Sequence, residues 1–444
     1  MTPTATSAQP LTPSFREAFH VWLRVAALSF GGPAGQIAVM HRIVVEEKKW
    51  IDEQRFLHAL NFCMLLPGPE AQQLATYLGW LLHGVRGGLV AGILFILPGF
   101  LSILALSYLY VLYVDAPLVT GLFLGLKAAV LALVLQALRT LAGRALNSVA
   151  LKLLALLSFV ALALFALPFP LLIVAVALLG MWAARYRTHW LGSAPLVDND
   201  AVPAPMSHGH VWRVLGVGLL LWALPLVLIV ATLGREHVLA QQAVFFGQVS
   251  VVTFGGAYAV LAYVAQQAVE AWQWLAPGEM LDGLGMAEST PGPLIQVLQF
   301  VGFLASWRDA APFSPGVAAF LGASVTTWAV FVPCFIFIFA GAPYVEALRH
   351  QPLLAGALRA ITAAVVGVIA SLALWFAGSV LFASQQAVSI AGLSVNVPVL
   401  DSLNWPIMLL VVAAWLALAR LKWGTGRVLV LSVCAGMLLQ LPSF

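Results

Sequence analysis

Two short motifs of glycine and proline interrupt apolar stretches of this sequence and could bind an anion. The first is FGGP at residues 30–33, and the second is PGP at residues 67–69. Gly allows a tight turn, and Pro suits the first position of the helix that follows. Helices starting after these turns would direct unpaired N–H groups and a positive dipole end inward. Such helix starts favour negatively charged ligands.

Three ionisable side chains lie in or beside apolar stretches, where a charge is costly and therefore often functional. Arg24 precedes FGGP, Lys127 lies in GLFLGLKAAVLALV, and Glu70 directly follows PGP. We predict that Arg24 and Lys127 recognise the anion; the alternative is that they snorkel towards lipid headgroups. A dianion beside Glu70 would drive its carboxylate to take up a proton. Glu70 is therefore the predicted pH-sensitive group, unless it only complements the helix dipole.

Polar side chains accompany both copies of the PGP motif. Gln72 and Gln296 each lie shortly after a PGP, and Glu288, Ser289 and Thr290 precede the second one. The predicted substrate-binding residues are Arg24, Phe30, Gly31, Gly32, Pro33, Pro67, Gly68, Pro69, Glu70, Gln72, Lys127, Gly255, Gly256, Thr290, Pro291, Gly292, Pro293 and Gln296.

The motifs occur twice because the chain contains an internal repeat. Residues 29–69 align without a gap with residues 253–293, every pair being 224 positions apart. Further along, LPGF at 97–100 aligns with VPCF at 332–335, 235 positions apart, and the loop near 306–316 accounts for the added residues. We therefore predict a fused duplication, an arrangement common among transporters.

The composition places these motifs in a membrane. The chain has 444 residues, of which 62% are hydrophobic and only 9% are charged, and its mean hydropathy is +0.99. A soluble exterior needs far more charge, so a soluble enzyme or a nucleic-acid-binding protein is excluded. The net charge of +4 comes from basic residues at segment ends, where they set orientation. Residues 1–14 are polar and contain no cleavable signal peptide.

Long apolar runs predict about nine full spans. Two regions per half fit poorly as single spans: in the first half, 18–45 is broken at FGGP and 56–82 at PGP. We predict four such broken or re-entrant hairpins in all, with full spans as the alternative. The predicted spans are 88–114, 117–138, 149–165, 168–184, 211–233, 313–343, 353–382, 404–420 and 425–441.

Basic residues indicate that the two halves have opposite orientations. Residues 42–55 carry four Lys or Arg side chains, whereas the repeat partner 266–279 carries none. The positive-inside rule then gives inverted-topology repeats, with a substrate site near the membrane midplane. The predicted organisation is a polar tail at 1–14, a first repeat at 15–186, a polar cytoplasmic linker at 187–210, a connecting helix at 211–233 and a second repeat at 234–444.

Motifs for several other chemistries are absent. The sequence contains no GxxxxGK[ST], HExxH or GxSxG, so energy must come from a gradient, the membrane potential or a partner protein. Cys63, Cys334 and Cys434 lie far apart without His at metal-ligand spacing. We predict no metal, no cofactor and no enzymatic activity. A membrane-embedded enzyme acting on a lipid or isoprenoid remains the less favoured alternative.

The motifs together resemble one transporter family. SFGGP, KKWIDEQRF, LLPGPEAQQLATYLGW and GVRGGLVAGILFILPGF occur in the first half, with a degenerate copy in the second. This combination is similar to the chromate transporter family, and the length resembles its long-chain, two-domain members. The second half departs from the family's pattern at Ala257 and Leu294, which stand where the first half has Pro33 and Glu70.

The resemblance implies a multi-pass protein of the bacterial inner membrane that exports chromate and confers chromate resistance. Together with the residues, it predicts a secondary anion transporter or antiporter whose halves rock around a tetrahedral divalent oxyanion. Sulfate and protons are further candidate ligands. The other expected partners are the lipid bilayer and a second copy of the chain in a homodimer. The alternatives are a transporter or channel for sulfate or another oxyanion.

Overall fold

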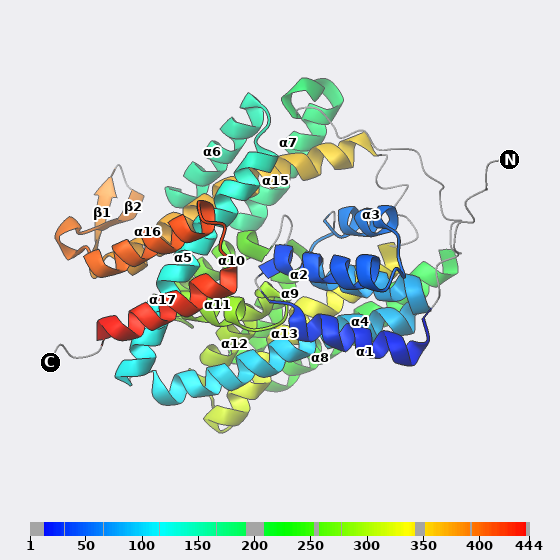
Figure 1. Ribbon diagram of the computed structural model, residues 1–444, viewed down its shortest axis with the longest axis horizontal. Coiled ribbons are helices and arrows are strands. Elements are labelled where there is room, and N and C mark those ends of the chain that lie inside the picture. Colours follow the sequence, from blue (N-terminus) through cyan, green and yellow to red (C-terminus); the bar gives the residue numbers. More distant parts are fainter. Residues whose placement is uncertain are drawn as a thin grey trace.

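The computed structural model is a bundle of helices, which confirms the predicted all-α polytopic membrane protein (Figure 1). It describes residues 13–30, 32–64, 66–114, 116–165, 167–191, 208–252, 257–276, 278–341, 351–390 and 393–440. Most of the predicted polar tail, most of the predicted linker, and the site residues Gly31, Gly255 and Gly256 lie outside the described residues.

The helices follow the breaks expected at the glycine and proline motifs. In the first half they are α1 (Phe15–Leu28), α2 (Gly32–His41), η1 (Arg42–Glu47), α3 (Glu53–Cys63), α4 (Glu70–Tyr113), α5 (Pro117–Ala145), α6 (Val149–Ala163), α7 (Phe169–Tyr186) and η2 (Thr188–Leu191). Helix α8 (His208–Leu233) corresponds to the predicted connecting helix.

The second half repeats this order. Its helices are α9 (Val238–Val252), α10 (Ala257–Gln266), η3 (Gln267–Ala271), α11 (Glu279–Ser289), η4 (Leu294–Gln296), α12 (Val297–Arg308), α13 (Pro315–Gly341), α15 (Pro352–Leu381), η6 (Leu400–Ser402), α16 (Trp405–Ala419) and α17 (Thr425–Gln440).

Helix α4 is a pair of arms rather than one rod. The backbone leaves helical geometry at His83 and at Gly84, whose φ is 60°, a value that suits Gly. The arms pack closely enough that a Cβ added to Gly79 would lie 2.5 Å from the carbonyl oxygen of Gly87. Its counterpart in the second half is the pair α12 and α13, where Gly302 approaches Gly322 in the same way.

The number of long spans is smaller than predicted. Among the described residues, six helices are long and apolar enough to cross a membrane: α4, α5, α7, α8, α13 and α15. The runs at 149–165, 404–420 and 425–441 form α6, α16 and α17, which have 15, 15 and 16 residues. At about 1.5 Å per residue these cover less than the roughly 30 Å of a hydrocarbon core. Side-chain caps from Ser148 and Asn404 fix where α6 and α16 begin.

Irregular backbone recurs at matching positions of the two halves. Lys49 and Gln273, 224 positions apart, have φ of 54° and 55°, and each closely follows a π-helical turn, η1 or η3. Gly68 and Gly292, also 224 apart, have φ of 124° and 112°. The backbone therefore has the same local conformation at these matching positions of the two halves.

A β-hairpin in the second half was not predicted. Strands β1 (Gln385–Ile390) and β2 (Leu393–Pro398) pair antiparallel, with Gln385 opposite Pro398. The hairpin lies in the segment that joins α15 to α16. It accounts for a change in repeat spacing, because α5 and α15 begin 235 positions apart whereas α6 and α16 begin 256 apart.

The two halves exchange helices. Helix α5 of the first half packs on α16 and α17, and α15 of the second half packs on α6 and α7, as Figure 1 shows. Small residues permit these crossings: a Cβ at Gly121 would lie 3.0 Å from the Gly436 carbonyl oxygen, and one at Gly180 would lie 2.5 Å from that of Gly356. Small residues at such crossings are typical of helix pairs in membranes.

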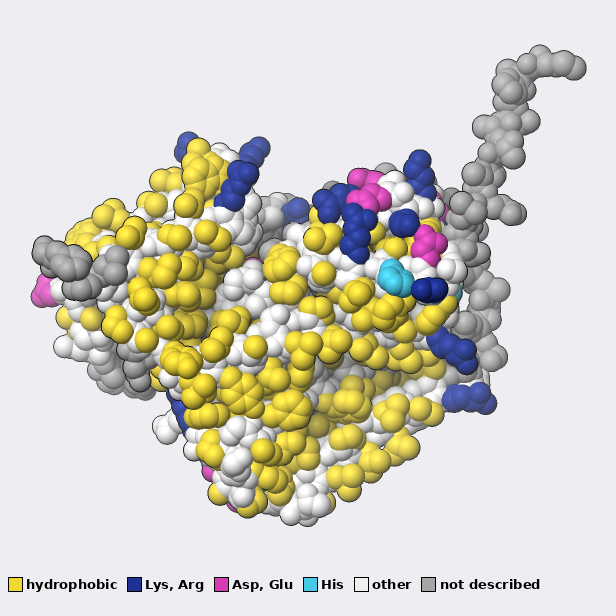
Figure 2. All heavy atoms as spheres, turned by 60° about the horizontal axis from the view of Figure 1, so that its bottom comes forward, with side chains coloured by type: hydrophobic (Ala, Val, Ile, Leu, Met, Phe, Trp, Pro, Cys, Tyr) yellow, Lys and Arg dark blue, Asp and Glu magenta, His cyan; other side chains and the backbone are white. Residues whose placement is uncertain are grey.

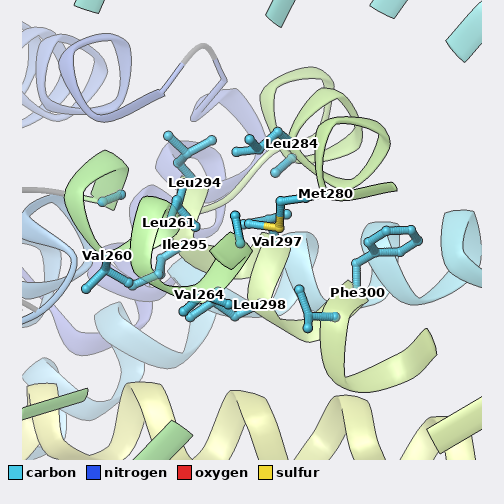
Figure 3. Packing of buried hydrophobic residues seen from close by; sticks show 14 of the residues in the cluster. Val260, Leu261, Val264, Met280, Leu284, Leu294, Ile295, Val297, Leu298 and Phe300 are labelled. Atoms are coloured by element: carbon cyan, nitrogen blue, oxygen red, sulfur yellow. The ribbon is translucent and has the colours of Figure 1, made fainter. Parts of the chain in front are cut away.

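The exterior and the core fit a membrane-embedded protein. Figure 2 shows hydrophobic side chains over most of one face, with charged side chains mainly along its upper edge. Large apolar residues are exposed on several long helices, including Leu101 on α4. The core around the second PGP is apolar, and Figure 3 shows side chains of α10, α11, η4 and α12 packed together.

Candidate substrate site at the broken helices

The FGGP turn of the first half contacts the PGP turn of the second. The Gly292 N–H donates to the Ser29 carbonyl oxygen at 3.0 Å. Gln36, on α2, donates through Nε2 to the Gly292 carbonyl oxygen at 2.6 Å. Both polar groups of one glycine are therefore held by the opposite half, and this contact joins segments more than 250 residues apart in sequence. We call this contact the crossing.

Each PGP turn also packs against a proline-containing helix of the other half. A Cβ at Gly292 would lie 2.8 Å from Cα of Gly99, on α4, and a Cβ at Gly68 would lie 2.8 Å from Sγ of Cys334, on α13. Gly99 and Cys334 directly follow Pro98 and Pro333 within LPGF and VPCF. The repeated motifs therefore bind one another reciprocally between the halves.

Local geometry explains why these turns contain glycine and proline. Gly68 and Gly292 have positive φ, a region that residues with a Cβ rarely adopt. Pro69 and Pro293 are the N-caps of α4 and η4, one position earlier than the predicted first helical position. Both follow the turn directly, so α4 and η4 begin immediately beside the contacts between the halves.

The start of α2 lies beside a buried carboxylate. Gly32 begins α2 with φ of 74°, and a Cβ there would be 3.6 Å from Oε2 of Glu288. Glu288 is 4% exposed and accepts a hydrogen bond at Oε1 from Tyr258 Oη at 2.6 Å. A negative charge beside a helix N-terminus is favourable. A carboxylate of the other half thus lies beside the start of α2, where the sequence predicts the anion.

Buried amide side chains surround both PGP turns. Gln72 donates to Thr76 Oγ1 at 3.0 Å, and Gln296 donates to Thr327 Oγ1 at 3.3 Å and to Gln299. Among the described residues, Oε1 of Gln36, Gln72 and Gln296 has no hydrogen-bond partner. A buried acceptor without a partner is costly. Each of these oxygen atoms is therefore an acceptor that water or a ligand can complete at its own turn.

Lys127 lies at the other end of α11 from the crossing. Its Nζ is 3.2 Å from Oδ2 of Asp282, and the same oxygen accepts a hydrogen bond from Tyr110 Oη at 3.0 Å. Lys127 comes from α5 of the first half and Asp282 from α11 of the second. The predicted cation is therefore paired with an acid across the two halves.

Arg24 is not brought to the crossing. Its guanidinium binds Glu47 at 2.7 Å, and the side chain is 49% exposed. Arg42 approaches the same carboxylate at 3.6 Å. The structure therefore places Arg24 in a surface ion pair, because the turn that follows α1 leads α2 and η1 back alongside it.

The other predicted residues lie at or near the two turns. Glu70 begins α4 and is partly buried, Thr290 donates to the Met286 carbonyl oxygen at 2.9 Å, and Phe30 is 46% exposed. Pro67 accepts a hydrogen bond from Gln73. The roles of these residues in substrate binding remain predictions.

Three residues of the site were missed from the sequence: Gln36, Tyr258 and Asp282. Gln36 and Tyr258 are buried or partly buried in the largely apolar helices α2 and α10, whereas Asp282 lies in α11, which also carries Glu279 and Glu288. Their repeat counterparts are Val260, Ala34 and His58, so none of the three positions has the same residue in both halves.

Comparison with known proteins agrees with the motif resemblance. The chromate transporter family model matches residues 16–181 and 240–439. A Pseudomonas aeruginosa protein named chromate transport protein is 33% identical over 372 residues, which is 83% of this chain and 82% of that protein. A Cupriavidus metallidurans protein of the same name is 28% identical over 358 residues, covering 81% of each.

The similarity extends beyond these bacteria. An uncharacterized transporter of Methanocaldococcus jannaschii is 26% identical over 368 residues, which is 82% of this chain and 85% of that protein. No solved structure is significantly similar to the chain.

Proposed function

Because this chain belongs to the chromate transporter family, we propose that it is a secondary transporter that exports chromate across the bacterial inner membrane. Export would confer chromate resistance on the cell. Two relatives that match over most of their length are named for chromate transport. The observation that carries the proposal is the crossing, where Gly292 of one half binds Ser29 and Gln36 of the other.

The crossing offers the groups that a tetrahedral oxyanion needs. The first N–H groups of α2 have no partners within their own helix, and Gly32, where α2 begins, lies beside the buried Glu288. Backbone donors of this kind replace water around an anion without adding a mobile charge. Gln36 and Gln296 add amide groups that can donate or accept.

Glu288 sets a condition on binding at this position. A carboxylate beside the start of α2 would repel a dianion placed there, since like charges in a buried site are strongly unfavourable. Binding therefore requires that Glu288 take up a proton or turn away together with Tyr258. Either event couples anion binding to a change in the second half of the chain.

Transport would follow from relative movement of the halves. The contacts at the crossing join the two halves, so a rocking motion would open the site first to one side and then to the other. No ATP-binding P-loop is present in the sequence, and an ion gradient or the membrane potential supplies the energy. Glu70 remains the predicted pH-sensitive group in the first half.

The test is uptake of radiolabelled chromate into inverted inner-membrane vesicles, with sulfate as competitor. We expect saturable uptake that responds to pH or voltage. Gln36→Leu should raise the chromate concentration for half-maximal uptake by about tenfold, because it leaves the Gly292 carbonyl unpaired. The matched control is Gln241→Leu, which removes only a hydrogen bond to the exposed Glu236 carbonyl.

The uptake measurements distinguish a chromate transporter from a sulfate transporter and from a channel. Uptake of sulfate that chromate fails to displace would make sulfate the substrate. Uptake that rises linearly with concentration would indicate a channel. Equal behaviour of Gln36→Leu and the control would remove the crossing from the substrate pathway.

A further inference from the structure

We propose that Lys127 and Asp282 form a second anion-binding site, in which the Asp282 carboxylate occupies the place of the transported dianion until it takes up a proton. This inference rests on the proposed function, because it assumes that an oxyanion passes through the protein. It assigns a role to Asp282, a residue at the opposite end of α11 from Glu288.

The geometry is that of a buried pair held by both halves. Lys127 Nζ lies 3.2 Å from Asp282 Oδ2, and Tyr110 Oη donates to that same oxygen at 3.0 Å. The Asp282 side chain is 4% exposed, whereas that of Lys127 is 27% exposed. The acid is therefore enclosed, and the cation has one open side.

The second oxygen of Asp282 is the position where a proton can bind. Oδ1 is buried and has no hydrogen-bond partner among the described residues. An ionised carboxylate normally accepts hydrogen bonds at both oxygens, and burial without them is costly. A proton can add to Oδ1 without first displacing Lys127 or Tyr110 from Oδ2.

Asp282 balances the charge of Lys127, because the neighbouring carboxylate, Glu279, is already paired with another basic residue. On the same helix, Glu279 binds the guanidinium of Arg308, from α12, at 2.6 Å. Tyr110 is the titratable group that faces Asp282 from α4, and Lys127 is the one from α5. Because Arg308 already balances Glu279, protonation of Asp282 would leave Lys127 with an unbalanced positive charge.

The exchange links one proton to one anion. While Asp282 is charged, the pair is neutral and offers a dianion little attraction. After Oδ1 takes up a proton, Lys127 keeps its charge and can bind an oxyanion on its open side. By linkage, the anion must in turn promote protonation of Asp282 to the same extent.

The experiment counts protons taken up when the anion binds. The purified full-length protein is titrated with chromate in weakly buffered solution, and the pH change is followed with an indicator dye. Relative to the wild type, Asp282→Asn should bind chromate about tenfold more tightly at alkaline pH and should take up one proton fewer per anion. Asp309→Asn, at an exposed position after α12, is the matched control and should behave as the wild type.

A second variant covers the case in which Asp282→Asn fails to fold. Tyr110→Phe removes a hydrogen bond that favours the charged carboxylate, so tight chromate binding should begin at a higher pH than in the wild type. An unchanged proton count in Asp282→Asn, or an unchanged pH onset in Tyr110→Phe, would overturn the inference.

The same titration with sulfate separates this inference from the proposed function. If the wild type binds sulfate but not chromate, and Asp282→Asn still lowers the proton count by one, the exchange stands and chromate export falls. If the wild type binds neither anion, both proposals fall.

Discussion

Two buried carboxylates stand six residues apart on α11, and each accepts a hydrogen bond from a tyrosine of another helix. Asp282 pairs with Tyr110 and Glu288 with Tyr258. A tyrosine hydroxyl stabilises a carboxylate without neutralising it. Among the described residues only Asp282 also has a basic partner, Lys127. The two acids are therefore unequal: one is balanced by a cation, and the other faces the start of α2.

The surface ion pair of Arg24 leads to a test of its predicted role. Arg24→Gln should leave vesicle uptake of chromate within about twofold of the wild type and should cost less than about 1 kcal/mol of stability, because exposed ion pairs contribute little. Lys127→Gln, measured in parallel, should lower uptake by about tenfold, since its charge is partly buried. A large loss in Arg24→Gln, with normal insertion, would restore the predicted role in anion binding.

A charged residue within an apolar helix identified Lys127 as a candidate site residue, but it did not identify the residue that Lys127 contacts. Lys127 could be selected because a cation inside an apolar run is costly. Its pairing with Asp282 could not be foreseen, since the two residues come from different halves and meet only through packing of α5 on α11. For the same reason Gln36 was overlooked: its hydrogen-bond acceptor, Gly292, is 256 positions away.

At the scale of elements, breaks in the helices were predictable and regular helix lengths were less so. Gly and Pro at 30–33 and 67–69 interrupt the helices where expected, because their backbone preferences are local. The π-helical turns η1 and η3 carry no such local signal. The β-hairpin formed by β1 and β2 was also missed, because it lies between the predicted spans 353–382 and 404–420, where no element was predicted.

Close approach of backbones at the LPGF motif is a property of the element pair, and one substitution tests it. In Gly99→Cys, the new Cβ would lie 2.9 Å from the Pro291 carbonyl oxygen and 3.3 Å from Cα of Gly292. Because backbone atoms cannot give way cheaply, we expect a loss of about 1–3 kcal/mol of stability and a fall in transport. Thermal unfolding in detergent and vesicle uptake measure the two effects.

The control for Gly99→Cys is the reverse change at its repeat counterpart. Cys334→Gly removes a side chain that lies next to Gly68. It should be tolerated better than Gly99→Cys, because it leaves a small cavity whereas Gly99→Cys creates a clash. If Gly99→Cys has the same unfolding temperature as the wild type, α4 and the second PGP turn do not approach each other as closely as described here.

At the scale of the whole molecule, the halves are interwoven rather than side by side. Helix α5 packs with α16 and α17, and α15 packs with α6 and α7. Each half therefore contributes a long helix that packs against helices of the other half. The internal repeat was visible in the sequence because its motifs have the same spacing in both halves. The exchange of helices was not, because it depends on contacts such as Gly121 on Gly436 that no repeat alignment contains.

Inverted orientation of the halves is a prediction that one pair of matched sites can test. Glu46 and Glu270 occupy equivalent positions, 224 apart, and both are exposed. In a Cys434→Ser background, which removes the exposed native thiol, Glu46→Cys and Glu270→Cys are treated on intact cells with a membrane-impermeant maleimide. The Lys and Arg around Glu46 should hold that segment in the cytoplasm, so only Glu270→Cys should react until the cells are permeabilised. Equal labelling of both on intact cells would place the two halves in the same orientation and remove the basis for a midplane site between inverted repeats.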